Sequence, residues 1–195
     1  MNDLIFFSNN SYKIKEVKKI LKYNNKLLTL KDLPKIIEPQ ENGDTFEKNA
    51  IIKSSFGFEK FGKPCFADDS GICVSALNNK PNVRSKRFQQ ESGGLNNALE
   101  IIINEVKKKK DFKAFFQTTI AITIEKNNTV CFEGIVNGKI SSTPMGNKGF
   151  HYDPIFIPEN SSKTYGQMSA NEKNEISHRS IAIKKLKRFL ENLVC

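Results

Sequence analysis

Two acidic residues lie side by side in FADDSGI, residues 66–72, between an apolar run and a Ser-Gly pair. Successive strand residues point to opposite faces, so Asp68 and Asp69 can bind one cation together only if the strand ends beside them. Ser70-Gly71 is typical of such an end. At a strand end the carboxylates could hold Mg²⁺, which prefers oxygen ligands, or one could orient a water and accept its proton. A solvated Asp-Ser-Gly turn is the equally ordinary alternative.

A second candidate is the loop SNNSYK, residues 8–13, which follows the apolar run LIFF. It places small polar side chains and backbone N–H groups before a helical pattern, with Lys13 in the first turn. These N–H groups, the positive end of the helix dipole and the lysine charge together favour a phosphate group. Plain helix N-capping by Asn10 or Ser11 explains the same residues without a ligand.

Two later stretches could recognise a base. In KGFHYDP, residues 148–154, Phe150 and Tyr152 could stack on a ring and Asp153 could accept hydrogen bonds from its edge, or the aromatics could simply be core. In SHR, residues 177–179, donors to a carbonyl or phosphate oxygen follow Lys173 at about one helical turn. A nucleophilic Ser-His pair is disfavoured, because adjacent helix positions diverge by about 100°. The four stretches together suit a nucleotide.

The elements that must position these residues alternate between strand and helix early in the chain and include a hairpin later. The apolar patterns predict strands at 4–7, 115–125 and 129–140, short extended pieces at 64–71 and 72–77, and helices after the 8–13 loop and over 44–62, 98–106 and 169–193. Asp44 with Glu47 and Ser169 with Glu172 have the spacing of capping boxes. An Asn127-Asn128 turn is expected in the hairpin.

Length and composition favour a folded protein. The chain has 195 residues, 38% hydrophobic and 27% charged, which suits one domain with a sizeable core. No apolar run approaches the roughly 20 residues of a membrane span, and the start MNDLIFFSNN is not typical of a signal peptide, so we expect no membrane partner and a cytoplasmic location. We expect the four cysteines, Cys65, Cys73, Cys131 and Cys195, to be reduced.

The net charge of +10 raises the question of an anionic partner. Lysines cluster at 107–110 and again at 184–188. Lysine runs on helices are usually solvated faces, and we expect that here. Nucleic-acid binding therefore stays a minority hypothesis.

Six separated blocks in this order resemble the Ham1/RdgB family, the inosine triphosphate pyrophosphatases. The blocks span residues 8–182 and read SNNSYK, ENGDTFEKNAIIKS, FADDSGICVSAL, PNVRSKRF, KGFHYDPIF and EKNEISHRSIA. The resemblance implies an α/β fold with an elongated mixed sheet flanked by helices, two lobes with a nucleotide cleft between them, and a homodimer of single ITPase-like domains over residues 1–195. It also implies Mg²⁺-dependent hydrolysis of ITP, dITP and XTP to the monophosphate and pyrophosphate.

The resemblance also assigns site residues. It makes Asp69 the general base and a metal-linked carboxylate, with Asp68 beside it. It makes Glu41 the metal-binding acid before the second helix, although Glu38 is close enough to leave that choice open. It places substrate binding at Ser8, Asn9, Asn10, Lys13, Lys53, Ser70, Phe150, His151, Tyr152, Asp153 and Lys173, and recognition of the 6-oxo group of the base at His178 and Arg179.

This sequence departs from the family pattern in its glycines. His151 stands where the family has Gly in the base-binding loop, which puts the base preference in question. Asn78, Asn79 and Asn82 also replace glycines, and Asn tolerates positive φ better than most residues. Two other functions remain open: a Maf-like pyrophosphatase with a different base preference, and a nucleotide- or RNA-binding module without catalysis.

Overall fold

The structure is a computed structural model that describes residues 3–23 and 26–193. The chain divides into two compact units. Unit 1 comprises Met1–Asp69, Thr118–Gly134 and Arg179–Cys195, and unit 2 comprises Ser70–Gln117 and Ile135–His178. Three strands contribute residues to both units, so the two units are built from one sheet.

The described residues form a seven-stranded mixed sheet, as predicted for an α/β protein. Its strand order is β2-β1-β3-β5-β6-β7, with β4 paired to β3. Strand β1 runs parallel to β2 and β3, whereas the β3–β4 and β6–β7 pairs are antiparallel. The strands are β1 (Asp3–Phe6), β2 (Lys26–Thr29), β3 (Cys65–Val74), β4 (Lys80–Pro81), β5 (Lys113–Glu125), β6 (Asn128–Ile140) and β7 (Phe156–Pro158).

Six α-helices are seen in the described residues: α1 (Ser11–Leu21), α2 (Phe46–Phe61), α3 (Ser85–Glu91), α4 (Leu95–Lys109), α5 (Ala170–Ile176) and α6 (His178–Asn192). Five of them lie in the four regions where the sequence predicts a helix, since the region 169–193 contains both α5 and α6. Helix α3 and the strands β2, β4 and β7 were not predicted. Helix α3 has only seven residues, too few for a clear apolar period, and one of them, Ser85, is fully buried.

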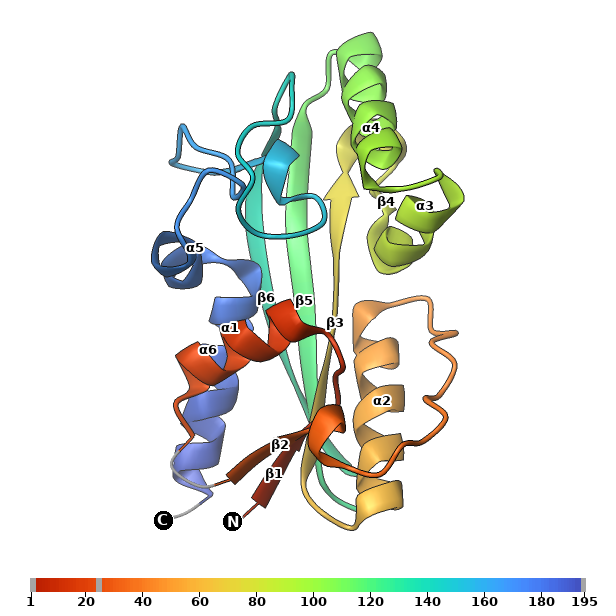
Figure 1. Ribbon diagram of the computed structural model, residues 1–195, viewed down its shortest axis with the longest axis vertical. Coiled ribbons are helices and arrows are strands. Elements are labelled where there is room, and N and C mark those ends of the chain that lie inside the picture. The colour runs from red at the N-terminus through yellow and green to blue at the C-terminus, as the bar shows by residue number, and fades with distance from the viewer. Residues whose placement is uncertain (1–2, 24–25, 194–195) are drawn as a thin grey trace. The chain divides into compact units, whose positions relative to one another are not determined.

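In unit 1 the alternation along the strands sends side chains to two helical layers. Leu4, Phe6 and Phe66 face one side, where they pack with α1 and α6. Ile5 and Ala67 face the other side, where aromatic residues of α2 cover them. Figure 1 shows α2 on one side of these strands and α1 with α6 on the other. Odd-numbered and even-numbered positions of this part of β3 therefore contact different helices.

The core of unit 2 lies between the sheet and α4. Ile72 and Val74 of β3 belong to one buried cluster with the apolar stripe of α4. Phe116 of β5 joins the same cluster through its ring contact with Phe156. The stripe consists of Ala98, Leu99, Ile102, Ile103 and Val106, which recur at three- and four-residue steps. Asn78, Asn79 and Asn82 all have positive φ, as their replacement of glycine predicts.

The predicted strand end at Ser70-Gly71 is wrong. Strand β3 runs without interruption from Cys65 to Val74, so the two predicted extended pieces are one strand. Nine of its ten residues are buried. A strand packed on both faces can continue through Ser-Gly, because the packing overrides the local turn preference.

The predicted single helix over 169–193 is also wrong in one respect. Its capping box is confirmed, with Glu172 N–H bonded to Ser169 Oγ and Ser169 N–H bonded to the Glu172 carboxylate. The helix then breaks at Ser177, whose backbone is extended at φ −72° and ψ 152°. The break separates α5 from α6 and starts α6 at His178.

Two smaller expectations need correction. Helix α2 is capped by Thr45, which accepts from the Lys48 N–H, and Asp44 instead pairs with the Lys48 ammonium. The hairpin turn lies at Lys126-Asn127, one residue earlier than predicted, with Asn127 at φ 63°.

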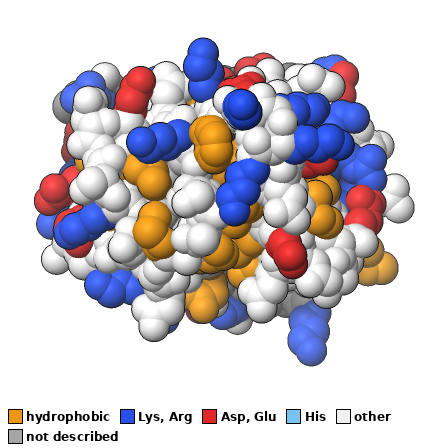
Figure 2. Space-filling view, turned by 90° about the horizontal axis from the view of Figure 1, so that it is seen from above, with side chains coloured by type: hydrophobic (Ala, Val, Ile, Leu, Met, Phe, Trp, Pro, Cys, Tyr) orange, Lys and Arg blue, Asp and Glu red, His pale blue; other side chains and the backbone are white. Residues whose placement is uncertain are grey.

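The lysine runs are mostly exposed, as expected, although Lys187 is half-buried. All four side chains of 107–110 are exposed on the last turn of α4. Figure 2 shows one face on which Lys and Arg side chains are interspersed with acidic and uncharged ones. Cys65, Cys73 and Cys131 are free thiols, and Cys195 lies outside the described residues. Within the described ranges, no helix combines the length and the apolar character needed to cross a membrane.

The core of unit 1 gives a direct test of the packing. Leu186 of α6 is fully buried, whereas Leu193, just after that helix, is 43% exposed. We expect Leu186→Ala to lower the free energy of unfolding by about 2–5 kcal/mol through lost transfer energy and a residual cavity. Leu193→Ala should change it by less than about 0.5 kcal/mol. Urea denaturation followed by circular dichroism measures both, and equal losses would contradict the assignment of this core.

Candidate functional site

Because β3 continues past them, Asp68 and Asp69 point to opposite faces of the strand. Both are nearly fully buried, at 3% and 7% exposure. Asp68 shares the face of Phe66, covered by α1 and α6, and Asp69 shares the face of Ala67, covered by α2. The two carboxylates thus have separate partners and cannot act as one bidentate pair.

On the α1 and α6 face, Asp68 is neutralised by two cations. Lys13 of α1 lies 2.9 Å from Asp68 Oδ2, and Arg179 of α6 donates from Nε to the same oxygen at 3.2 Å. Arg179 also donates from Nη1 to Glu16 of α1 at 2.5 Å. Burial alone would raise the pKa of Asp68, but Lys13 and Arg179 outweigh it and hold that pKa far below its ordinary value. Asp68 is therefore a permanently ionised centre of a buried charge network.

On the α2 face, Asp69 is held by residues one helical turn apart. Asn49 donates from Nδ2 to Asp69 Oδ2 at 3.1 Å, and the Lys53 ammonium lies 3.6 Å from Oδ1. Burial raises the pKa of Asp69, and the charge of Glu41 adds to the rise, while Lys53 and Lys13 oppose it. A raised pKa suits a carboxylate that has to accept a proton.

Lys53 joins two carboxylates. Its ammonium donates to Glu41 Oε2 at 2.9 Å and to the Asp68 carbonyl oxygen at 2.7 Å, in addition to its contact with Asp69. Burial opposes the charge of Lys53, but Asp69, Glu41 and Asp68 outweigh it and raise the pKa of the lysine. Lys53 therefore stays protonated between the carboxylates of Glu41 and Asp69.

These two carboxylates suit a hard cation. Mg²⁺ is commonly bound by one or two protein carboxylates together with substrate phosphates and water. Glu41 and Asp69 both reach the Lys53 ammonium, so they flank a common point, and Glu41 is 42% exposed on its side chain. Across residues 3–23 and 26–193, no three His, Cys, Asp or Glu side chains are grouped in a way that could hold a metal ion. A cation here would need phosphate or water oxygens as further ligands.

The loop before α1 is built as an N-cap. Asn10 Oδ1 accepts from the N–H groups of Tyr12 and Lys13, and Ser8 Oγ accepts from the Asn10 N–H. Asn9 donates from Nδ2 to Glu38 Oε1 at 2.7 Å. Glu38 therefore contacts this loop, whereas Glu41 contacts Lys53 near Asp69.

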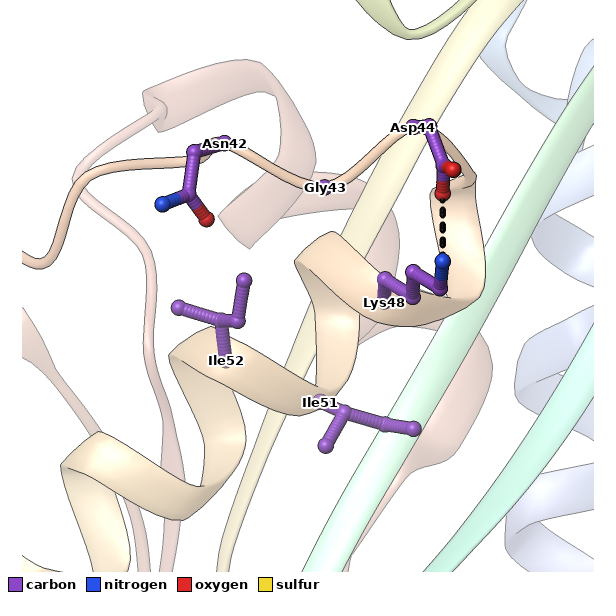
Figure 3. A pocket seen from close by; sticks show the side chains of 6 residues that line it. All are labelled: Asn42, Gly43, Asp44, Lys48, Ile51 and Ile52. Carbon is purple, nitrogen blue, oxygen red and sulfur yellow. Dashed lines mark ion pairs between the residues drawn. The ribbon is translucent and has the colours of Figure 1, made fainter.

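An open depression lies over the start of α2 (Figure 3). It is lined by Asn42, Gly43, Asp44, Lys48, Ile51 and Ile52. Lys48 reaches up to Asp44 on the loop above it, in an ion pair of 2.8 Å. Its lining residues are not those that contact Asp68 or Asp69, so the depression borders the Glu41 loop without containing the acidic centre.

In unit 2 the loop 149–153 folds around the carboxylate of Asp153. Asp153 Oδ2 accepts from the Phe150 N–H at 2.8 Å and from the Lys173 ammonium at 2.7 Å. Gly149 has φ +78°, and a Cβ there would lie 2.1 Å from Asp153 Oδ2. Only glycine permits this close approach.

Aromatic rings surround the Lys173 ammonium of unit 2. It lies 4.6 Å from the ring centre of Phe150 and 5.5 Å from that of Tyr165. His178 stacks on Phe116 with ring centres 4.7 Å apart and an angle of 8° between the planes. Aromatic rings, an ammonium and a carboxylate are groups of the kinds that can contact a base.

The predicted residues thus fall into two groups. The charged residues of unit 1 contact one another, and they are Lys13, Glu41, Lys53, Asp68, Asp69 and Arg179. In unit 2, Asp153 contacts Phe150 and Lys173. His151 and Tyr152 each contact a residue of helix α3. The adjacent residues His178 and Arg179 contact different groups, because Arg179 binds Asp68 and Glu16. Ser70 is half-buried on β3.

Several contributing residues were missed by the sequence analysis, namely Glu16, Asn49, Gln89, Phe116 and Tyr165. Asn49 could have been found, since it lies four residues before Lys53 on the same face of α2. The others act through contacts between distant segments, which the spacing of one helix or strand does not reveal.

Comparisons with known proteins agree with this architecture. The model of the Ham1 family matches residues 4–189. The dITP/XTP pyrophosphatase of Flavobacterium psychrophilum is 39% identical over 189 residues, covering 97% of this chain and 99% of that protein. The dITP/XTP pyrophosphatase of Bacillus subtilis is 37% identical, with 98% of each chain covered.

Solved structures give the same result. The Staphylococcus aureus Ham1 protein is similar with a TM-score of 0.88 and 35% identity, covering 98% of this chain and 99% of the other. A nucleoside-triphosphatase / dITP/XTP pyrophosphatase from Mycobacterium abscessus is similar with a TM-score of 0.77 and 33% identity, covering 94% and 98%.

The buried charge network of unit 1 predicts a large effect of removing one cation. Arg179→Met should lower the free energy of unfolding by about 3–5 kcal/mol, because Asp68 and Glu16 lose a buried partner. The exposed pair of Arg84 and Glu91 is the matched control, and Arg84→Met should cost less than about 1 kcal/mol. Urea denaturation of both variants measures the difference, and similar losses would refute a buried role for Arg179.

Proposed function

The chain belongs to the Ham1 family, and from this premise we propose that it hydrolyses dITP, ITP and XTP to the nucleoside monophosphate and pyrophosphate. Asp69 carries the proposal. It is a buried carboxylate with a raised pKa, oriented by Asn49 and flanked by the Lys53 ammonium. Such a group is suited to take a proton from water beside a phosphate chain. A non-catalytic binding module would have no use for it.

The proposal includes Mg²⁺, held by Glu41 and Asp69 with substrate phosphates as further ligands. When bound, the ion would neutralise the triphosphate and polarise its α-phosphate. Asp68 has a different role from the one first expected. Its carboxylate is on the other face of β3 and is engaged by Lys13 and Arg179, so it fixes these cations in place and leaves the metal to Glu41 and Asp69.

The reaction then needs one proton acceptor and several positive charges. Asp69 takes a proton from a water molecule as the water oxygen bonds to the α-phosphorus. The bond from the α-phosphorus to the bridging oxygen breaks, and that oxygen leaves as part of pyrophosphate. Lys13 and Lys53 offset the charge on the departing group. The loop of Ser8, Asn9 and Asn10 contributes polar groups for the same phosphates.

The groups of unit 2 are proposed to bind the base. Phe150 provides aromatic surface, and Lys173 and Asp153 provide fixed polar groups. Tyr152 lies in the core of unit 2, as the alternative interpretation of this aromatic predicts, so it supports the loop from within. A donor directed at the 6-oxo group accepts hypoxanthine and xanthine, a role we propose for His178. Adenine presents an amino group there, which leaves the donor without an acceptor and costs about 1–3 kcal/mol. Two further parts of the proposal are a homodimer, which the family resemblance implies, and a cytoplasmic location, which the sequence pattern predicts.

The first test is the product. ITP incubated with protein and Mg²⁺ should give IMP and pyrophosphate, and release of single phosphates would reject the proposal.

Asp69→Asn should reduce turnover by about 10²–10⁴-fold, since the amide cannot accept the proton. Asp44→Asn is the matched control, because Asp44 is an acidic residue with a 75% exposed side chain, and it should keep the wild-type rate. Thermal melting of each variant checks the fold.

A second test separates the two candidate metal acids. Glu41 contacts Lys53 beside Asp69, whereas Glu38 contacts Asn9. Glu41→Gln should raise the Mg²⁺ concentration for half-maximal activity by about 10- to 100-fold, a loss of roughly 1.4–2.7 kcal/mol of binding. Glu38→Gln should change it by less than about threefold. Titration calorimetry with Mg²⁺ and a slowly hydrolysed triphosphate reports the same affinities, and the reverse order would reassign the ligand.

A further inference from the structure

Helix α3 presents one face to the loop 149–153 that the proposed function assigns to the base. Ser85 and Gln89 are four residues apart, so they lie on the same side of this helix. Each contacts one of two consecutive loop residues. The Tyr152 hydroxyl donates to the Ser85 carbonyl at 2.7 Å, and His151 Nδ1 lies 2.7 Å from Gln89 Oε1.

The Ser85 contact is firmly built into unit 2. Ser85 Oγ donates to the Asn82 carbonyl at 2.6 Å and accepts from the Ile72 N–H of β3 at 3.1 Å. Ser85 and Tyr152 are both buried. This end of α3 is therefore fixed to the sheet. Tyr152 is held in place as well, because its hydroxyl bonds to Ser85 at this end.

The Gln89 contact supports a loop residue in a backbone conformation that side chains disfavour. His151 has φ +54°, in the left-handed region. Glycine would adopt this conformation with less strain, but it would carry no side chain to reach α3. The imidazole of His151 reaches Gln89 on one side and meets the edge of Phe150 on the other, with ring centres 5.2 Å apart.

We propose that His151 and Gln89 are positioning residues that anchor the base-binding loop to α3. The proposal rests on the proposed function, because the ring that the anchor orients, Phe150, is the one assigned to stack on the base. Where a glycine would leave the loop backbone flexible, the His151 side chain holds the loop to α3 through its hydrogen bond with Gln89. The tether acts on binding of the base, and the chemistry at Asp69 takes place in unit 1 with its own partners.

The test compares Gln89→Ala with Gln90→Ala. Gln90 is the same residue type at the next position of α3, and it is exposed. Loss of one hydrogen bond predicts that Gln89→Ala raises KM for ITP about three- to tenfold with kcat within about twofold. Gln90→Ala should leave both constants unchanged. Hydrogen exchange of the amides of residues 149–153 should be faster in Gln89→Ala than in Gln90→Ala.

Two further variants identify the partner. Gln89→Glu retains an oxygen that accepts from His151 Nδ1, so KM should stay near the wild-type value. His151→Gly should raise KM as Gln89→Ala does, and the double variant should be no worse than either single variant, because both remove the same contact.

The outcomes separate the two proposals. Wild-type turnover of ITP with equal KM in wild type and Gln89→Ala would overturn the anchor while leaving the function intact. Additive effects in the double variant, or a fall in kcat instead of a rise in KM, would also overturn it. A wild-type protein with no turnover of ITP, dITP or XTP would overturn both. If Gln89→Ala unfolds, the KM values of Gln89→Glu and His151→Gly are compared instead. The anchor predicts a higher KM for His151→Gly, and equal KM values would overturn it.

Discussion

Two carboxylates buried in the middle of one strand are the constraint on which the rest of unit 1 depends. An ionised group removed from water costs several kcal/mol unless a partner and hydrogen bonds compensate it. Asp68 and Asp69 lie on opposite faces of β3, so each forms its ion pairs with different cations. The α1 and α6 face supplies Lys13 and Arg179, and the α2 face supplies Lys53.

The constraint also explains the different chemistry of the two acids. Asp68 meets two cations, which stabilise its charge so strongly that it cannot accept a proton near neutral pH. Asp69 meets the Lys53 ammonium at 3.6 Å, an amide donor and the negative charge of Glu41, and burial dominates, so its pKa rises. Adjacent residues of the same type thus have pKa values shifted in opposite directions, because strand parity gives them different neighbours.

The sequence predicted most elements and most of the acids and cations, but not their grouping. The alternation that places Ile120, Ile122 and Ile124 on one face of β5 was confirmed, since these residues pack in the core of unit 1. The continuation of β3 through Ser70 was missed, because burial on both faces outweighed the turn preference of Ser-Gly. Once the strand is known to continue, the alternation of side chains along it places the two carboxylates on opposite faces, as observed.

The loop of unit 2 shows why the sequence left base recognition open. His151 in place of glycine put the base preference in question, because spacing alone does not show what the imidazole contacts. The contact with Gln89, 62 positions away in the chain, turns the side chain toward α3. A residue that is strained in its backbone but held by a distant partner stabilises one loop conformation among several. Selectivity for a base requires such a fixed surface, because a donor that can follow its acceptor discriminates poorly between a carbonyl and an amino group.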